Sequence, residues 1–189
     1  MSATARESDT ELITRIRAGD RLALHALYAR HHVKVFRFAL RLLRSEPSAE
    51  DVVSEVFTDV WRNPANFQGR SEASTWLLAI TRNKAYSILR RKREQELDED
   101  DAAETEDPAD DPEVVLQKKD KGEILRACIE RLSAEHREVI DLVYYHDKSI
   151  EEIALIVGAP EGTVKTRMFY ARKKLSELAK AAGLDRGWP

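Results

Sequence analysis

The clearest chemistry in the sequence belongs to one helix-forming stretch, GAPEGTVKTRMFYARKKL, at residues 158–175. Its apolar side chains recur at spacings of four, three and four, the pattern of a buried helix face: Val164, Met168, Ala171 and Leu175. At about 100° per residue, basic, hydroxyl and aromatic side chains gather within an arc of about 120° on the opposite side: Lys165, Thr166, Phe169, Arg172 and Lys173. An aromatic ring among exposed bases suggests that this face binds nucleic acid.

A second helix and a turn would position this face. Ser149 and Glu152 match a capping box, in which two side chains three residues apart satisfy backbone amides at a helix start. Apolar residues follow at helical spacing: Ile150, Ile153, Ala154 and Val157. Gly158 can end that helix, and Pro160 suits the first turn of the next one. Two short helices joined by a tight turn predict a helix-turn-helix, whose second helix can enter the major groove.

The outer face of the second helix divides by chemistry. Three bases can neutralise phosphates: Lys165, Arg172 and Lys173. Three other side chains can contact base edges or thymine methyl groups: Thr166, Phe169 and Tyr170. Gly162 lets backbone amides at the helix start approach a phosphate closely. The alternative is an ordinary solvated face with one stray aromatic, but the capping box, the turn and the basic face together favour DNA binding.

A basic stripe is also predicted in the first half of the chain, on a helix that starts near Thr75. Its members are spaced four, four and three: Arg82, Tyr86, Arg90 and Arg93. Trp76 and Asn83 lie on a neighbouring face, and for Trp76 a place in the core is favoured over contact with a base. Basic grooves with aromatic platforms suit single-stranded nucleic acid as well as duplex backbone. The loop NPANFQGRSEAS precedes this helix.

An acidic ridge is predicted on the helix that begins after Pro47, with Ser48 as its cap. Val52, Val53, Val56, Phe57 and Val60 would face inward. Five side chains share the outer side: Asp51, Glu55, Thr58, Asp59 and Arg62. Such a ridge would repel phosphate, whereas a protein partner with a basic helix would complement it. A merely solvated surface is an equal alternative at this point.

Charge is distributed unevenly along the 189 residues. The net charge is −3, but residues 94–120 contain 13 acids and 2 bases, so the remainder of the chain is basic. This acidic stretch has no aromatic residue and two prolines, a composition that favours a flexible linker, whether as a plain spacer or with a binding role. It divides the chain into two small helical domains, and no alternating strand pattern is found in either. The predicted fold class is all-α.

Composition and motifs exclude several classes. No apolar run reaches the roughly 20 residues of a membrane span, and the N-terminus has no apolar core like that of a signal peptide. The single cysteine, Cys128, excludes an internal disulfide and is expected to be a buried thiol. There is no Gly-rich phosphate loop, no HExxH and no cysteine cluster, and the adjacent His31 and His32 would point about 100° apart. We therefore expect a cytoplasmic protein that is not an enzyme, with no catalytic residue, metal or cofactor.

Several motifs together resemble one family. AEDVVSEVFTDVW, FQGRSEASTWLLAITRNKA, the acidic linker, LSAEHREVIDLVYY and SIEEIALIVGAPEGTVKTRMFYARKKL are similar to region 2 and region 4 of bacterial sigma factors of the extracytoplasmic-function (ECF) group. The likeness covers about residues 12–180, in the family order, with a short linker in place of region 3 and no region 1.1. It implies region 2 at residues 12–94, a linker at 95–120, region 4 at 121–180 and a tail at 181–189.

The resemblance also implies which residues bind which partner. The segment from Ser48 to Trp61 would dock on the clamp coiled coil of RNA polymerase, with these contact residues: Asp51, Glu55, Thr58, Asp59, Trp61 and Arg62. The loop at residues 66–74 would capture an extruded base of the promoter −10 element, and the following helix would lie along the melted strand: Asn66, Phe67, Gln68, Arg70, Ser71, Trp76, Arg82, Asn83, Tyr86, Arg90 and Arg93. The recognition helix would read the −35 element: Gly162, Thr163, Lys165, Thr166, Arg167, Phe169, Tyr170, Arg172 and Lys173.

The resemblance thus predicts a sigma factor that binds core polymerase, selects promoters, promotes strand opening and is held inactive by an anti-sigma factor. A tyrosine at position 170 departs from the arginine often found in the family, so the −35 sequence does not follow from the resemblance. A repressor or activator that never joins polymerase is the main alternative, and a polymerase-associated decoy that does not open DNA is a third. The acidic ridge, the loop and the basic stripe argue against the repressor.

Overall fold

A computed structural model describes residues 7–99 and 121–184, and these residues form eight α-helices, one 3-10 helix and no strand. The predicted all-α fold is therefore confirmed. The elements run as follows: α1 (Asp9–Arg17), α2 (Arg21–Leu43), α3 (Glu46–Arg62), η1 (Pro64–Asn66), α4 (Ala73–Glu99), α5 (Lys121–Glu130), α6 (Ala134–Tyr144), α7 (Ile150–Val157) and α8 (Glu161–Ala181). None of these helices combines the length and the apolar character needed to cross a membrane.

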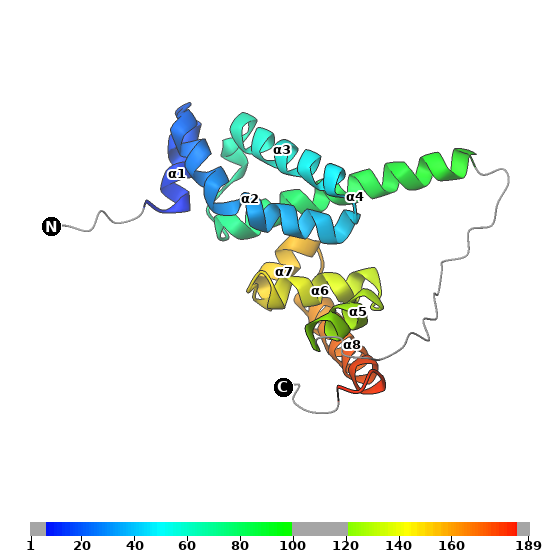
Figure 1. The fold of residues 1–189 in the computed structure, drawn as a ribbon. Helices are drawn as coiled ribbons and strands as arrows, with labels where there is room; N and C mark the ends of the chain where they lie inside the picture. Colours follow the sequence, from blue (N-terminus) through cyan, green and yellow to red (C-terminus); the bar gives the residue numbers. More distant parts are fainter. Residues whose placement is uncertain (1–6, 100–120, 185–189) are drawn as a thin grey trace.

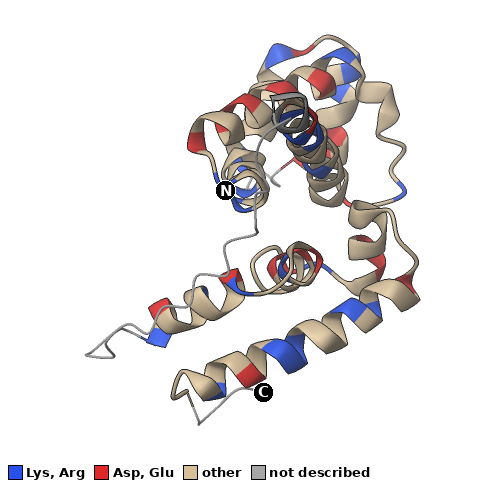
Figure 2. Cartoon of the chain, turned by 90° about the vertical axis from the view of Figure 1, so that its right-hand side faces the viewer, with Lys and Arg blue, Asp and Glu red and all other residues tan. Residues whose placement is uncertain are grey.

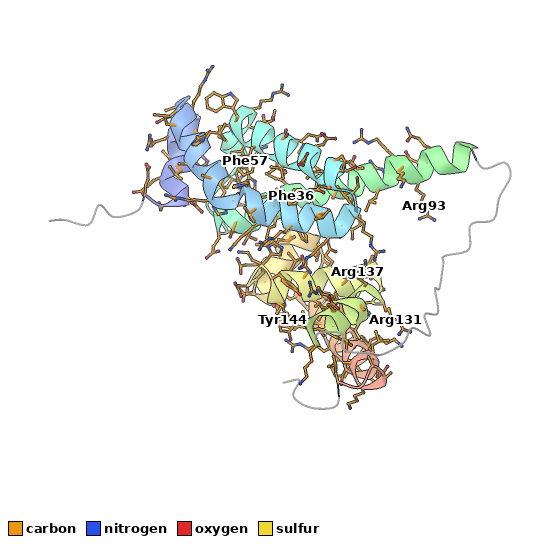
Figure 3. The ribbon with its side chains drawn as sticks, viewed as in Figure 1. Phe36, Phe57, Arg93, Arg131, Arg137 and Tyr144 are labelled. Carbon is orange, nitrogen blue, oxygen red and sulfur yellow. The ribbon has the colours of Figure 1, made fainter. Side chains whose placement is uncertain are left out.

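The N-terminal domain packs α2 against α3 and α4, with α1 lying against α2 (Figure 1). The predicted inward face of α3 is confirmed, because Val52, Val56 and Val60 are fully buried. Figure 3 shows Phe57 among the helices of this domain, and its ring contacts Tyr28 edge-on at 4.9 Å. The cap of α3 was predicted wrongly: the Ser45 hydroxyl accepts from the Ser48 amide, so the helix starts before Pro47 rather than after it.

The C-terminal domain contains the predicted helix-turn-helix, formed by α7 and α8. The capping box is present, with the Ser149 hydroxyl accepting from the Glu152 amide and the Glu152 carboxylate accepting from the Ser149 amide. Gly158 ends α7 with φ of 65°, a left-handed conformation that glycine adopts without strain. The four predicted core residues of α8 are all buried. Cys128 on α5 is buried too, and burial raises the pKa of its thiol.

The two domains also pack against each other. Phe38 of α2 and Leu78 of α4 are buried in the same apolar cluster as the core of the C-terminal domain. Figure 1 shows α7 directly beneath α2 and α4, and α7 contacts α4 closely. A flexible linker alone would leave the two domains free to move independently, so these contacts are what join them. Helix α4 continues to Glu99, five residues into the predicted linker, and the linker from residue 100 to 120 lies outside the described residues.

Candidate nucleic-acid and polymerase interfaces

The outer face of α8 carries two large aromatic rings that its fold does not use. Phe169 and Tyr170 are 64% and 52% exposed, and their ring centroids are 5.4 Å apart in an edge-on arrangement. The opposite face of the same helix is closed, because Val164 and Ala171 are fully buried. Figure 2 shows Lys and Arg residues repeated along α8. An exposed aromatic pair beside cations leaves this face available to a ligand, as predicted from the spacing.

Four of the predicted −35 residues also line one hollow. The hollow, of about 560 Å³, is bordered by α8 and the first residue of α7: Ile150, Lys165, Met168, Phe169, Arg172, Lys173 and Ser176. The Thr166 hydroxyl donates to the Gly162 carbonyl at 2.9 Å, so toward a ligand it can only accept a hydrogen bond or offer its methyl group. Arg167 lies elsewhere and pairs with Glu135 of α6 at 2.8 Å. The geometry therefore assigns Arg167 a contact within the domain.

The C-terminal domain covers one half of the basic stripe on α4. Arg82 Nε lies 2.6 Å from Oε1 of Glu138 on α6, and the Tyr86 hydroxyl donates to Oε2 of the same carboxylate at 3.4 Å. The Arg82 guanidinium also lies over the Tyr86 ring, 4.3 Å from its centroid. Burial raises the pKa of Tyr86, and the negative charge of Glu138 raises it further. Half of the predicted DNA-binding stripe is thus occupied by another part of the same chain.

The far half of the stripe lies open. The Arg90 side chain is exposed and approaches Glu94 only at 3.9 Å. Figure 3 shows Arg93 on the part of α4 that extends away from the rest of the molecule. Asn83 is exposed as well. Trp76 is partly buried against the N-terminal core, as favoured from the sequence.

The predicted −10 loop is held in place by residues of both domains. Phe67 is buried against Trp76 with ring centroids 5.2 Å apart, so it supports the loop from inside and its ring is not available to a base. Asn66, Gln68 and Arg70 are exposed, and Ser71 is partly so. At the far end of the loop, Lys148 Nζ donates to Glu72 at 3.1 Å and to the Ser74 hydroxyl at 2.7 Å.

Arg17 of α1 is a functional candidate that sequence reasoning missed. Its Nε donates to the Pro64 carbonyl at 3.3 Å, and its Nη2 donates to the Phe67 carbonyl. The side chain thereby fixes the backbone at the start of the loop. A hollow of about 340 Å³ lies beside it, lined by α1 and the loop: Thr10, Ile13, Thr14, Arg17, Ala65, Phe67, Gln68 and Gly69. No local pattern could have revealed these bonds, because they join positions about 50 residues apart.

The acidic ridge of α3 is exposed, as predicted. Asp51, Glu55, Thr58 and Arg62 are exposed, and Asp59 and Trp61 are partly so. Lys84 of α4 lies beside the ridge, with Nζ 2.7 Å from Asp59 and 3.2 Å from Glu55. Burial lowers the pKa of Lys84, but the hydrogen bonds to Asp59 and Glu55 outweigh it and raise the pKa overall. Asp51 is exposed and makes no such ion pair.

A polar cluster connects the loop to the helix-turn-helix. Glu152 Oε1 accepts from Lys148 at 2.8 Å and from the Thr75 hydroxyl at 2.5 Å, so one carboxylate caps α7 and also contacts α4. Burial raises the pKa of Glu152, but the bonds from Lys148, Thr75 and the Ser149 amide prevail and lower it to about 2. In residues 7–99 and 121–184, no group of three or more His, Cys, Asp or Glu side chains could hold a metal ion.

Comparisons with known proteins agree with this arrangement. Residues 27–95 match the family model of sigma-70 region 2, and residues 122–175 match that of sigma-70 region 4. The chain is 32% identical over 174 residues to ECF RNA polymerase sigma factor SigL of Mycobacterium tuberculosis, covering 89% of this chain and 96% of SigL. It is 32% identical over 177 residues to the ECF RNA polymerase sigma-E factor of Escherichia coli K12, covering 89% and 92%.

Two solved structures are similar over both domains. CnrH in complex with the cytosolic domain of CnrY has a TM-score of 0.67 and 25% identity, covering 93% of this chain and 99% of CnrH. The sigma factor RpoE from Bartonella quintana, in complex with the anti-sigma factor NepR, has a TM-score of 0.64 and 31% identity, covering 84% and 96%. With both regions matched in order and close relatives aligned over most of their length, the chain belongs to the ECF family of RNA polymerase sigma factors.

Proposed function

We propose that this sigma factor directs RNA polymerase to promoters by dividing recognition between its two domains. The C-terminal domain reads the −35 element through α8, and the N-terminal domain binds the −10 element through the loop at residues 66–74 and the basic face of α4. The observation that carries the proposal is the exposed pair Phe169 and Tyr170 on a basic helix whose opposite face is fully buried. The fold gains nothing from leaving two aromatic rings in water.

On α8, reading and positioning fall to different side chains. Thr166 and Phe169 lie nearer the helix start, where a recognition helix meets base edges. Arg172 and Lys173 lie about one turn further along and border the same hollow as Phe169, and we assign them to the phosphate backbone because their charge suits it. Tyr170 is exposed beside Phe169 and adds apolar surface for a thymine methyl group.

At the −10 element the loop provides polar groups on a fixed backbone. Asn66, Gln68 and Arg70 can hydrogen-bond the edge of a base that has left the stack. Unstacking a base costs a few kcal/mol, and a site formed in advance offsets that cost better than a loop that must order on binding. Arg17 and Lys148 supply this order from two sides. Asn83, Arg90 and Arg93 then follow the single strand along α4.

The ridge of α3 is proposed as the polymerase contact. Its carboxylates are exposed, and the rest of the N-terminal half is basic, so a basic helix of the polymerase is the complementary partner. Asp51, Glu55, Thr58 and Asp59 would form the centre of the contact, with Trp61 and Arg62 at its end. We place the protein in the cytoplasm, where polymerase and DNA are found. An anti-sigma factor is proposed as a further partner, supported by the complex of the similar RpoE with NepR.

Transcription with purified components tests the proposal. Core polymerase with this protein should yield discrete run-off products from a fragmented genomic library, while core alone should not, and the protein should co-elute with core on a sizing column. A helix-turn-helix repressor would instead bind specific duplexes without core and yield no product. Glu177→Gln, an exposed change on α8 away from the proposed −35 residues, serves as the control variant and should transcribe normally.

A further inference from the structure

A strongly basic groove lies between α2 on one side and α5 and α6 on the other. Two adjoining hollows of about 530 and 260 Å³ form it, and they share three lining residues, Arg41, Arg126 and Tyr145. The larger hollow falls within the range of about 300–1,000 Å³ that is usual for small-molecule sites. Among the described residues that line the groove, Glu130 is the one carboxylate, against six cations: Lys34, Arg37, Arg41, Arg44, Arg126 and Arg137.

Four of these cations come from α2, at spacings of three, four and three: Lys34, Arg37, Arg41 and Arg44. They therefore share one face, over about 15 Å of its length. Lys34, Arg37 and Arg44 are exposed and form no ion pair with any described residue. Cations stabilise the C-terminus of a helix, but only within its last turn, which Lys34 and Arg37 precede. Like charges so close repel one another, and a bound anion would relieve this repulsion.

Arg137 of α6 forms the opposite wall, between the two domains (Figure 3). Its Nη2 donates to the Leu132 carbonyl at 2.9 Å, while its Nε is buried and has no hydrogen-bond partner among the described residues. Burial lowers the pKa of Arg137 and the positive charge of Arg44 lowers it further, with Glu130 acting in the other direction. A buried donor without an acceptor destabilises a fold, so an acceptor brought by a ligand would stabilise it.

Arg41 and Arg126 connect the two hollows. Arg41 Nη1 lies 2.9 Å from Asp141 Oδ1, and its guanidinium lies 3.7 Å from the centroid of the Tyr145 ring, so this side chain is held in place. Arg126 on α5 is exposed, and its Nε donates to the Gly122 carbonyl at 3.0 Å. This bond leaves the two terminal nitrogens of Arg126 for a ligand.

The number of donors in the groove favours phosphate over carboxylate as the anion. A guanidinium binds either group through paired N–H donors. A phosphate group presents three acceptor oxygens and up to two charges, whereas a carboxylate presents two oxygens and one charge. Five arginines line the groove, and each guanidinium has five N–H donors. A chain of phosphates would therefore satisfy more of these donors in the same volume than a carboxylic acid would.

We propose that this groove binds a small anion with several linked phosphates, such as a nucleoside triphosphate or a short inorganic polyphosphate. In the larger hollow its phosphates contact Lys34, Arg37 and Arg126, and in the smaller hollow they contact Arg44 and Arg137. The site is independent of the proposed promoter function, because none of its cations is assigned to DNA or to polymerase.

Calorimetric titration of the free full chain with inorganic tripolyphosphate, without magnesium, tests the site. We expect one tripolyphosphate per chain, and affinity about tenfold weaker for Arg37→Gln and for Arg126→Gln, because each loses a charge-assisted bond to phosphate. Both arginines are exposed, so neither change should disturb the fold. Arg21→Gln removes the same charge from an exposed position at the start of α2, outside the groove, and should bind normally.

Two further ligands define the chemistry of the site. ATP distinguishes the two sources of a phosphate chain: tighter binding of ATP than of tripolyphosphate would identify a nucleotide site, and the reverse would identify a polyphosphate site. Citrate, a tricarboxylate, should bind more weakly than either. If citrate binds as tightly as tripolyphosphate, the assignment to phosphate is wrong.

Three other results would overturn the proposal. One is the absence of saturable tripolyphosphate binding to the wild-type chain. Another is an equal loss of affinity in Arg21→Gln and Arg37→Gln, which would show that the ligand responds to overall charge and not to this groove. The third is binding of a mixed-sequence single-stranded DNA that depends on Arg37 and Arg126 and that tripolyphosphate does not displace, which would make the groove a nucleic-acid surface instead.

Discussion

Arg82 on α4 and Glu138 on α6 are 56 positions apart in the sequence, yet 2.6 Å separates the Arg82 Nε from the Glu138 Oε1. The carboxylate is nearly inaccessible to water, so the pair is a fixed contact between the domains and not a transient surface ion pair. One contact therefore joins the predicted −10 stripe to the domain that carries the predicted −35 helix. In this arrangement Arg82 cannot also contact a DNA phosphate through the atoms that hold Glu138.

Charge reversal on the ridge should weaken polymerase binding without unfolding the protein. Asp51 is exposed and has no cation beside it, so Asp51→Lys removes no contact that holds the fold. We expect affinity for core to fall about tenfold, which corresponds to about 1.4 kcal/mol. Glu50→Lys makes the same reversal on the next residue, which points about 100° away, and should bind normally. Equal affinity of Asp51→Lys and wild type for core, with unchanged circular dichroism, would contradict the assignment of the ridge.

Substitutions on α8 should separate base reading from backbone positioning. Thr166→Ala and Phe169→Ala should relax preference at particular −35 bases, each by about 1–3 kcal/mol. Arg172→Ala should weaken binding for all sequences alike and lower the salt slope by about one unit per lost phosphate contact. The measurement is a titration of −35 variants against each mutant holoenzyme at several salt concentrations. A uniform loss for Phe169→Ala together with altered base preference for Arg172→Ala would mean that the helix lies in the groove in the opposite sense.

Removing Arg17 should loosen the −10 loop. The Arg17→Ala variant loses both bonds to the loop carbonyls, and hydrogen bonds from a charged donor contribute about 1.5–3 kcal/mol each when buried, less when partly exposed as here. We expect weaker discrimination among −10 sequences in run-off assays and unchanged discrimination at −35. Arg21→Ala, an exposed change at the start of α2, is the matched control. An Arg17→Ala holoenzyme that keeps its full −10 preference would show that the loop needs no support from α1.

Acid should weaken the fold through Glu152. Its pKa of about 2 lies below the ordinary value of 4.5, so its ionised form stabilises the fold above pH 4.5, and this stability is lost as the pH falls from 4.5 toward 2. The shift corresponds to an upper limit on the order of 3 kcal/mol. Glu152→Gln should therefore be less stable than wild type in urea at pH 7, by a margin that shrinks by pH 3. Glu151→Gln, an exposed change on the same helix, should be as stable as wild type. If the stability difference between Glu152→Gln and wild type grew toward acid pH, ionised Glu152 would not be the cause of the stabilisation.

Local patterns in the sequence predicted local structure well. The capping box of Ser149 and Glu152, the stop at Gly158 and the buried stripe of α8 each depend on residues within a few positions of one another, and all are confirmed. The α3 cap was misplaced because Ser45 and Ser48 both suit the role, and the choice depends on how α2 ends at Arg44, in a left-handed conformation. Helical spacing also put Arg82 and Tyr86 correctly on one face.

Long-range partners could not be predicted in the same way. The spacing of Arg82 and Tyr86 predicts that both side chains share one face of α4. It cannot predict that Glu138 covers this face, because that contact depends on how the two domains pack. Arg17 was missed for a similar reason, since an arginine that donates to backbone carbonyls leaves no complementary residue in the sequence. Phe67 was predicted as a −10 contact from the resemblance, and the structure buries its ring against Trp76.

Strand opening at a promoter tests the central claim most directly. Permanganate modifies thymines that are not stacked in a duplex, so it reports where the strands have separated. On a promoter identified by run-off transcription, core polymerase and this protein together should make thymines in the −10 region reactive, whereas either component alone should leave them protected. Reactivity should fall when the −10 or the −35 sequence is changed. Tight sequence-specific binding of the protein alone, with no reactive thymines after core is added, would contradict the account and favour a repressor.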